Sequence, residues 1–313
     1  MNLLDINKKF PTEKAALDHL AKVRWGDNPT CPYCGSDRVT NMPGQLRYHC
    51  NAENRSYSVR ANSIFEESRL DIRKWFYGIA LMMNAKKGLS AMQFSRDVGV
   101  TYKTAWYCLM RIRCALADQE VFLHSVVQVD EAFIGGKPRK AGNTYFTSLK
   151  DKNKRGRGTS KAKVVVMVEQ RKGGKAVAQM LPNLTSQQLT ELLKKNIHQK
   201  HSIVVTDKYR GYNKLDQFFN HVTIEHAEEF SKNGINLNKA EGFIGLLKRG
   251  LIGQYHKLSM KYLPFYLAEF TFRYNHNLDK KVWDKAIELS IEKNKCMLRY
   301  KCDPHKPVKV CDI

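Results

Sequence analysis

The sequence lacks an apolar run long enough to span a bilayer, and its first twenty residues lack the apolar core of a signal peptide. These absences argue against a membrane protein and predict one that stays in the cytoplasm. A hydrophobic content of 42%, with 14 Phe and 14 Tyr, excludes a disordered chain. At 313 residues the chain is long enough to hold two or three folded domains.

Acidic residues are scarce relative to basic ones. The chain has 30 Asp and Glu against 53 Lys and Arg, which gives a formal net charge of +23 at pH 7. An excess of this size predicts a polyanionic partner, and nucleic acid is the first candidate. The alternative is a basic surface that only keeps the protein soluble.

One cysteine is missing from a zinc-binding pattern near the N-terminus. Cys31 and Cys34 have the CxxC spacing at which a tight turn directs two thiolates at one ion, and Cys50 follows on an expected hairpin. The residue three positions after Cys50 is Glu53 instead of a fourth cysteine. Glu53 or His49 is the candidate fourth ligand, although a carboxylate ligates zinc less readily than a thiolate does. The alternative is a degenerate ribbon that folds without metal.

Helical patterns flank this segment. Residues 10–24 form an amphipathic pattern with Thr12 as the expected N-cap, and residues 70–84 form an apolar one with a basic edge. Both patterns predict short helices.

The segment 86–116 has the pattern of two helices joined by a tight turn. Met92 and Phe94 are expected to bury the first helix, Gly99 to form the turn, and Thr101 to cap the second helix. The length and the turn suit a DNA-binding helix-turn-helix, and the alternative is an ordinary helical hairpin. Candidate groove contacts on the second helix are Tyr102, Lys103, Thr104 and Tyr107, with Arg111 and Arg113 near phosphates.

From residue 125 the pattern changes to strands and helices in alternation. We interpret the order as three strands, a helix, a strand, a helix, a strand and a final helix, which is the order of an RNase H-like domain of the α/β class. The predicted strands are 126–136, 162–170, 174–181, 201–207 and 221–226, and the predicted helices are 185–197 and 237–253.

Three acids stand out because this fold would bring them together. Asp130 lies on the first strand, Asp207 ends the fourth strand beside it, and Glu241 lies on the later helix, away from its apolar stripe. Three such carboxylates suit two Mg²⁺ or Mn²⁺ ions, which prefer oxygen ligands and keep positions open for phosphate and water. Taken singly, each acid is more often a turn, cap or surface residue, and the competing acids nearby are Glu131, Glu228 and Glu229.

These segments resemble the IS1595 group of bacterial DDE transposases, also called ISXO2-like, over nearly the whole chain. By that resemblance Asp130, Asp207 and Glu241 match the DDE triad, and Asn238 matches a polar position just before the Glu. The matching segments are "FPTEKAALDHLAKVRWGDNPTCPYCGSDRV" for its ribbon, "KKGLSAMQFSRDVGVTYKTAWYCLMRIR" for its helix-turn-helix, and "QVDEAFIGG", "VVTDKYRGY" and "NKAEGFIGLLKRGLIGQYH" for its catalytic blocks.

The resemblance implies a transposase that binds the terminal inverted repeats of its own insertion sequence. It would hydrolyse the phosphodiester at the element ends and join the freed 3′-OH to target DNA, as a homo-oligomer on DNA at the nucleoid. Two rivals are a regulator that binds DNA without chemistry and a nuclease that cuts without joining. The expected domains are an N-terminal helix and zinc ribbon at 1–68, a helix-turn-helix region at 69–120, the catalytic domain at 121–290 and a basic tail at 291–313.

A basic segment separates the first two catalytic strands. Residues 136–163 carry ten Lys and Arg and one acid, so this run is either a solvated loop or a contact to the DNA backbone near the cleavage point. The tail has Cys and His at irregular spacing, which favours an exposed basic tail over a metal site. The residues expected at DNA here and on the catalytic helix are Lys154, Arg155, Arg157, Asn238, Lys248 and Arg249.

Overall fold

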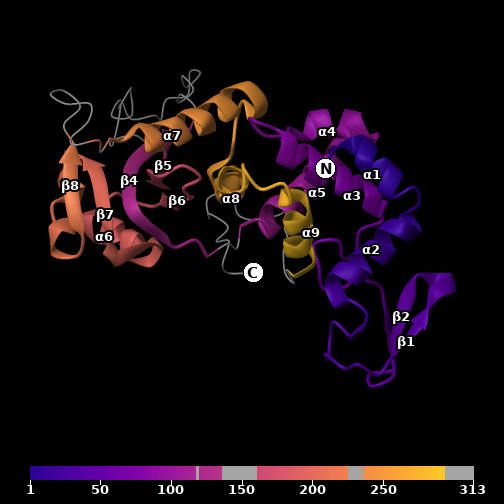
Figure 1. Ribbon diagram of the computed structural model, residues 1–313. Coiled ribbons are helices and arrows are strands. Elements are labelled where there is room, and N and C mark those ends of the chain that lie inside the picture. Colours follow the sequence, from indigo (N-terminus) through magenta and orange to yellow (C-terminus); the bar gives the residue numbers. More distant parts are fainter. Residues whose placement is uncertain (118–119, 136–160, 225–233, 235, 293–313) are drawn as a thin grey trace, which may run out of the picture. The chain divides into compact units, whose positions relative to one another are not determined.

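The computed structural model describes residues 1–117, 120–135, 161–224, 234 and 236–292 (Figure 1). The chain divides into two compact units, the first formed by residues up to 117 together with 276–292, and the second by residues 120–275. Within these described ranges, no helix combines the length and apolarity needed to cross a bilayer.

The first unit is helical and carries one small sheet. The sheet is antiparallel with the order β1-β2-β3. Its elements are α1 (Leu3–Lys9), α2 (Glu13–Trp25), β1 (Val39–Met42), β2 (Arg47–Cys50), β3 (Arg55–Tyr57), α3 (Ile72–Asn84), α4 (Ala91–Val98), α5 (Tyr102–Ala115) and α9 (Val282–Glu292).

Local signals fix where these helices begin and end. The Thr12 hydroxyl accepts a hydrogen bond from the N–H of Ala15, and Thr101 caps α5 in the same way, as predicted. Gly99 ends α4 with φ of 64°, a left-handed conformation that glycine adopts without strain. Phe94 is fully buried, but the prediction for Met92 is wrong, because 48% of its surface is exposed.

The last described helix belongs to the first unit. The Trp283 ring stacks near Phe10 and meets Phe76 edge-on at 5.3 Å, and its Nε1–H donates to the Phe76 carbonyl at 3.4 Å. The α9 helix thus packs against α2, α3 and α5. The expected boundary at 290 assigned this helix to the catalytic domain, whereas its core contacts are with the N-terminal helices.

The second unit is built on a mixed five-stranded sheet with the order β6-β5-β4-β7-β8. The β4–β5 and β5–β6 pairs are antiparallel, and the β4–β7 and β7–β8 pairs are parallel. Its elements are β4 (Leu123–Ile134), β5 (Ala162–Glu169), β6 (Ala176–Leu181), α6 (Ser186–Asn196), β7 (Ile197–Asp207), β8 (Asn220–Ile224), α7 (Asn238–Gly250) and α8 (Leu263–Asn275).

Helices cover both faces of this sheet, which explains the unbroken apolar runs of its central strands. One face packs on α6, and the other packs on α7 and α8. The predicted strands and the helices at 185–197 and 237–253 are present. The expected helix between the last two strands is wrong, because that connection contains only two short 3₁₀ turns, Arg210–Tyr212 and Leu215–Gln217.

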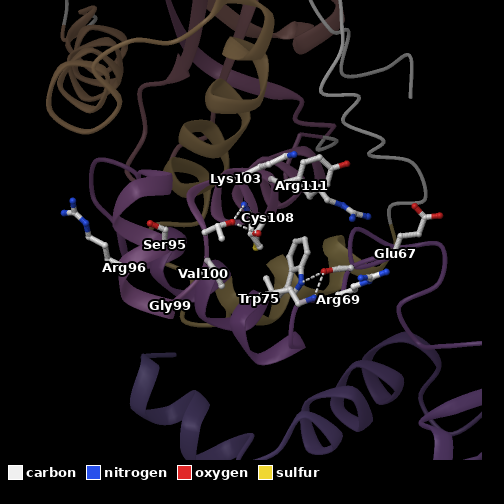
Figure 2. A pocket seen from close by; sticks show the side chains of 15 residues that line it. Glu67, Arg69, Trp75, Ser95, Arg96, Gly99, Val100, Lys103, Cys108 and Arg111 are labelled. Atoms are coloured by element: carbon white, nitrogen blue, oxygen red, sulfur yellow. Dashed lines mark hydrogen bonds between the residues drawn. The ribbon is translucent and has the colours of Figure 1, made fainter.

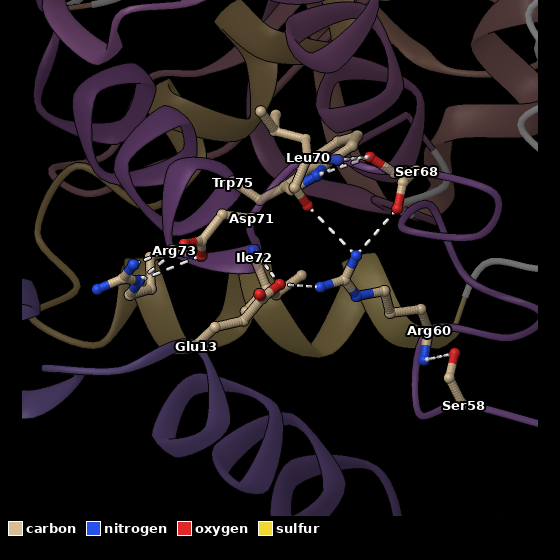
Figure 3. Close-up of polar contacts among 9 residues, drawn as sticks. All are labelled: Glu13, Ser58, Arg60, Ser68, Leu70, Asp71, Ile72, Arg73 and Trp75. Atoms are coloured by element: carbon tan, nitrogen blue, oxygen red, sulfur yellow. Dashed lines mark hydrogen bonds and ion pairs between the residues drawn. The ribbon is translucent and has the colours of Figure 1, made fainter. Parts of the chain in front are cut away.

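A polar network ties the segment after the small sheet to the helices of the first unit (Figure 3). The Arg60 guanidinium pairs with Glu13 of α2 and donates to the carbonyls of Ser68 at 2.9 Å and Leu70 at 3.3 Å. Glu13 also accepts from the N–H of Ile72 at the start of α3. One mostly buried cation thereby satisfies three acceptors on two segments.

We predict that Arg60→Met destabilises the first unit by about 2 kcal/mol, because three partly buried acceptors lose a charged donor. Arg73→Met is the control, since the Arg73 side chain is 32% exposed, pairs with Asp71 only two residues away and otherwise donates to the exposed Pro11 carbonyl. Its cost should stay below about 1 kcal/mol. Equal destabilisation by the two variants would contradict the assigned role. Urea unfolding followed by tryptophan fluorescence reports on the first unit alone, because it holds all four tryptophans: Trp25, Trp75, Trp106 and Trp283.

Candidate active site and metal centre

Strand pairing brings two of the three predicted acids together. In the parallel β4–β7 pair, Gln128 lies opposite Val205. Asp130 and Asp207 each follow two residues later, so they lie level on neighbouring strands and point to the same face of the sheet. That face is the one covered by α7, because Ala132 of β4 packs there.

The third acid comes from the helix on that face. Glu241 lies exposed in the first turn of α7, whose apolar stripe packs on β4 and β5. Burial, and then the negative charges of Asp207 and Glu241, raise the pKa of Asp130, while the nearby Lys248 ammonium lowers it. The three acids and Lys248 therefore share one electrostatic neighbourhood.

The competing acid lies on the other side of the sheet. Glu131 alternates with Asp130 along β4 and so faces the α6 side, where Tyr212 is buried. Burial, and then the negative charge of Glu131, hold the pKa of Tyr212 well above its usual range. The strand pleat thus separates Glu131 from the triad, a distinction that adjacent positions in the sequence could not make.

The three cysteines form a compact cluster in the first unit. The sulfur atoms of Cys31, Cys34 and Cys50 all lie within 4.8 Å of one another, and Cys34 Sγ is 3.6 Å from Cys50 Sγ. This is the spread expected of ligands around one ion with metal–sulfur bonds of about 2.3 Å. Cys34 is exposed and the other two are buried. The donor set fits zinc.

Neither expected fourth ligand joins this cluster in the described part of the chain. His49 lies on the opposite face of β2 from Cys50 and hydrogen-bonds through Nδ1 to Ser56 Oγ at 3.1 Å. Glu53 approaches the cluster with its backbone: its N–H, together with that of Ala52, lowers the pKa of the Cys50 thiol against the effect of burial. The fourth ligand therefore stays a prediction, because the geometric cluster contains the three sulfur atoms alone.

A groove of about 1010 Å³ lies along α5 in the first unit (Figure 2). Of the predicted groove contacts, Lys103, Thr104, Tyr107 and Arg111 line it, and Tyr102 is exposed on the first turn of the same helix. The floor includes buried Trp75 and Cys108, and the exposed cations along the groove are Arg69, Arg96 and Lys103.

Two arginines of α5 hydrogen-bond to backbone carbonyls within the first unit. The Arg111 guanidinium donates to the carbonyls of Glu66 at 2.9 Å and Ser63 at 3.4 Å, which fixes the loop that borders the groove. Arg113 is 1% exposed and donates to the Leu89 carbonyl at 3.1 Å. The prediction that Arg113 lies near phosphate is wrong, because its charge is used inside the unit.

The remaining predicted DNA contacts divide between α7 and segments outside the described residues. Asn238, Lys248 and Arg249 are exposed along α7. A Cβ added to Gly245 would come within 3.1 Å of Arg249 Nη1, so this glycine gives the guanidinium room to lie along the helix. The residues outside the described ranges are Lys154, Arg155, Arg157 and those of the tail from 293.

Two family models match parts of this chain. Residues 122–275 match the ISXO2-like transposase domain, and residues 11–52 match the transposase zinc-ribbon domain of the IS1595 group. The chain belongs to the IS1595 group of transposases. It is also similar to an uncharacterised protein in transposable element ISH50 of Halobacterium salinarum, with 26% identity over 275 residues that cover 85% of this chain and 92% of that protein.

Solved structures that resemble this IS1595-group chain are more distant. The crystal structure of the Mos1 strand transfer complex covers 70% of this chain and 78% of its own, at 12% identity and a TM-score of 0.28. A pre-cleavage Mos1 transpososome covers 69% and 78%, at 15% identity and a TM-score of 0.24.

We predict that Asp130→Asn stabilises the metal-free protein at neutral pH. A carboxyl whose pKa is raised in the folded state lowers stability once ionised, and this cost disappears as pH falls through the folded-state pKa. Asn keeps the acceptor for the Glu131 N–H, which lies 2.7 Å from Asp130 Oδ1. Calorimetric melting should give a higher midpoint for the variant at pH 7 and a shrinking difference toward acid pH. A lower midpoint at pH 7 would contradict it.

Proposed function

We propose that this protein is a DNA transposase that cuts the ends of its own insertion sequence and joins them to target DNA. The observation that carries the proposal is the level position of Asp130 and Asp207 on neighbouring strands, facing the helix that bears Glu241, within the matched ISXO2-like domain. An antiparallel trio of strands followed by a parallel pair, in the order 3-2-1-4-5, supports an RNase H-like fold for this unit.

The triad has the donor set for divalent cations. Asp130, Asp207 and Glu241 would hold two Mg²⁺ or Mn²⁺ ions, which supply Lewis-acid activation of the attacking oxygen and stabilisation of the leaving oxygen. Asp130 and Asp207 would ligate the ions from the sheet, because neighbouring strands fix the positions of both side chains. Glu241 would complete the site from the helix, where its exposed carboxylate could ligate the ions that contact a bound phosphodiester.

Chain residues beside the triad suit a phosphodiester. Lys248 lies close enough to Asp130 to affect its pKa, so its ammonium can meet a phosphate oxygen at the same site. Water attacks first and frees a 3′-OH, and that 3′-OH then attacks target DNA, so no protein nucleophile is needed. Asn238 and Arg249 extend the exposed polar edge of α7 along the strand being cut.

We propose that the first unit recognises the terminal inverted repeats. The capped α5, the Gly99 turn and the cation-lined groove support a helix-turn-helix in which Tyr102, Lys103 and Thr104 face the DNA. The expected domains at 1–68 and 69–120 would act as one body, extended by α9. Because the two ends of the element are cut and joined together, we expect the protein to act as a homo-oligomer on DNA. We expect this assembly in the cytoplasm. Lys154, Arg155 and Arg157 are proposed backbone contacts near the cut.

We predict that purified protein joins a labelled element end to a target plasmid in Mg²⁺, and that Asp207→Ala abolishes both cutting and joining. Losses of 10³-fold or more are expected, on the order of those from removing groups that stabilise a transition state. Glu191→Ala is the matched control, because Glu191 is an exposed acid on α6 at the opposite face of the sheet. It should retain wild-type activity.

The outcomes separate the proposal from its rivals. Binding by the wild type without cutting or joining would establish the regulator, and cutting without joining would establish the nuclease. Joining that persists in Asp207→Ala would mean that this acid is not part of the site.

We further propose that Cys31, Cys34 and Cys50 bind zinc without the Glu53 side chain. The prediction is that Glu53→Ala keeps the zinc content of the wild type, Cys34→Ser lowers it, and Glu53→Cys raises zinc affinity by adding a fourth thiolate. Metal analysis after dialysis and the visible spectrum of the Co²⁺-substituted protein measure these effects. An altered Co²⁺ spectrum in Glu53→Ala would show that the carboxylate is a ligand after all.

A further inference from the structure

Gln128 is a fully buried polar side chain at the centre of the second unit. It lies on β4 two residues before Asp130, and the strand pleat turns both side chains toward α7. Its amide group makes four hydrogen bonds, to two backbone N–H groups and two side-chain amides. A buried amide with all of these hydrogen bonds fixes the positions of its partner groups.

The first turn of α7 takes its cap from this side chain. Leu237 occupies the N-cap position and makes no side-chain cap. Gln128 Oε1 instead accepts from the N–H of Lys239 at 2.8 Å and of Ala240 at 3.1 Å. These are among the N–H groups that a helix start leaves without intrahelical partners. Backbone N–H groups only donate, so they fix which end of the Gln128 amide faces the helix.

The other end of the amide secures the segment that leads into α7. Gln128 Nε2 donates to Asn236 Oδ1 at 3.1 Å and to Gln170 Oε1 at 3.2 Å. Asn236 Oδ1 also accepts from the N–H of Asn238, the first residue of α7. Gln170 in turn donates to the Gly234 carbonyl at 2.7 Å. One side chain thus connects β4, the end of β5 and the start of the helix.

We propose that Gln128 is a positioning residue for the active site: it holds the first turn of α7 against β4, so that Glu241 converges with Asp130 on the same cations. Glu241 directly follows Ala240, whose N–H is bonded to Gln128. The inference rests on the proposed function, because it assigns Gln128 a role in the metal site of that reaction.

A neutral amide suits this position better than a carboxylate does. A carboxylate could accept from both N–H groups, and the positive end of the helix dipole would favour it. It could not donate to Asn236 and Gln170, and it would add a fourth negative charge beside three carboxylates. Gln128→Met removes both the acceptor and the donor at similar volume, and Gln128→Glu keeps the acceptor alone. The pair therefore separates loss of the helix cap from loss of the hydrogen bonds to Asn236 and Gln170.

The test compares full-length wild type, Gln128→Met, Gln128→Glu and Thr190→Val. Thr190→Val is the control, because it removes a hydroxyl that bonds the Ser186 carbonyl inside α6. In Gln128→Met we expect faster hydrogen exchange in the peptide that starts α7, with α6 and β5 unchanged. The Mn²⁺ concentration for half-maximal cutting of an element end should rise roughly 10- to 100-fold, with much of the maximal rate recovered at high Mn²⁺.

Gln128→Glu should protect the α7 start better than Gln128→Met does, and Thr190→Val should match wild type in both measurements. Unchanged exchange or unchanged Mn²⁺ dependence in Gln128→Met, with an active wild type, would overturn the positioning role alone. A wild type that neither binds Mn²⁺ by calorimetry nor cuts DNA would overturn the proposed function, and this inference with it. If Thr190→Val lost as much cutting activity as Gln128→Met, the loss would come from lower stability, and the positioning role would be overturned.

Discussion

The parallel register of β4 on β7 is the constraint on which the second unit depends. It brings Asp130 and Asp207 level although they are far apart in sequence. A slip of one residue would turn Asp130 toward α6 and Glu131 toward α7. The same slip would exchange the apolar residues of both core faces, so the core holds the register that the site needs. The residues that would change faces are Val127, Val129, Ala132 and Ile134.

The buried Glu169 and the partly buried Asp130 differ in how their charges are stabilised. Burial alone would raise the pKa of Glu169, but hydrogen bonds from the N–H groups of Lys175 and His124, and from Arg171, lower it. Asp130 has the opposite balance, because burial and two acidic neighbours outweigh its one backbone donor. Glu169 is thus stabilised as an anion by donors of the protein itself, whereas Asp130 lacks a matching set of donors and would be stabilised by the proposed cations. In a chain of net charge +23, the three neighbouring carboxylates form a local cluster of negative charge.

Patterns in the sequence predicted what is local and missed what is assembled over distance. The caps at Thr12 and Thr101 and the turn at Gly99 follow from neighbouring residues, so spacing alone found them. Periodicity also found the strands and the helix of Glu241. It assigned Arg113 to the surface, because nothing in the local pattern reveals that Leu89 offers a buried acceptor. The placement of α9 failed for the same reason, since its partners lie at the other end of the chain. The cap on α7 could not be predicted either, because Gln128 is distant in sequence and reads as one polar residue in an apolar strand.

The two candidate metal sites stand in opposite relations to folding. The three thiols come from one short segment, and its turns also direct N–H groups at the sulfur atoms of Cys34 and Cys50, so a bound metal would reinforce the local fold. This also explains why spacing located that site but not its fourth ligand: the backbone of Glu53, and not its carboxylate, approaches Cys50. The acids come from three distant elements and repel one another, so the fold must hold them together against that repulsion. The strand register positions Asp130 and Asp207, and the start of α7 positions Glu241. The buried amide of Gln128 caps the start of α7.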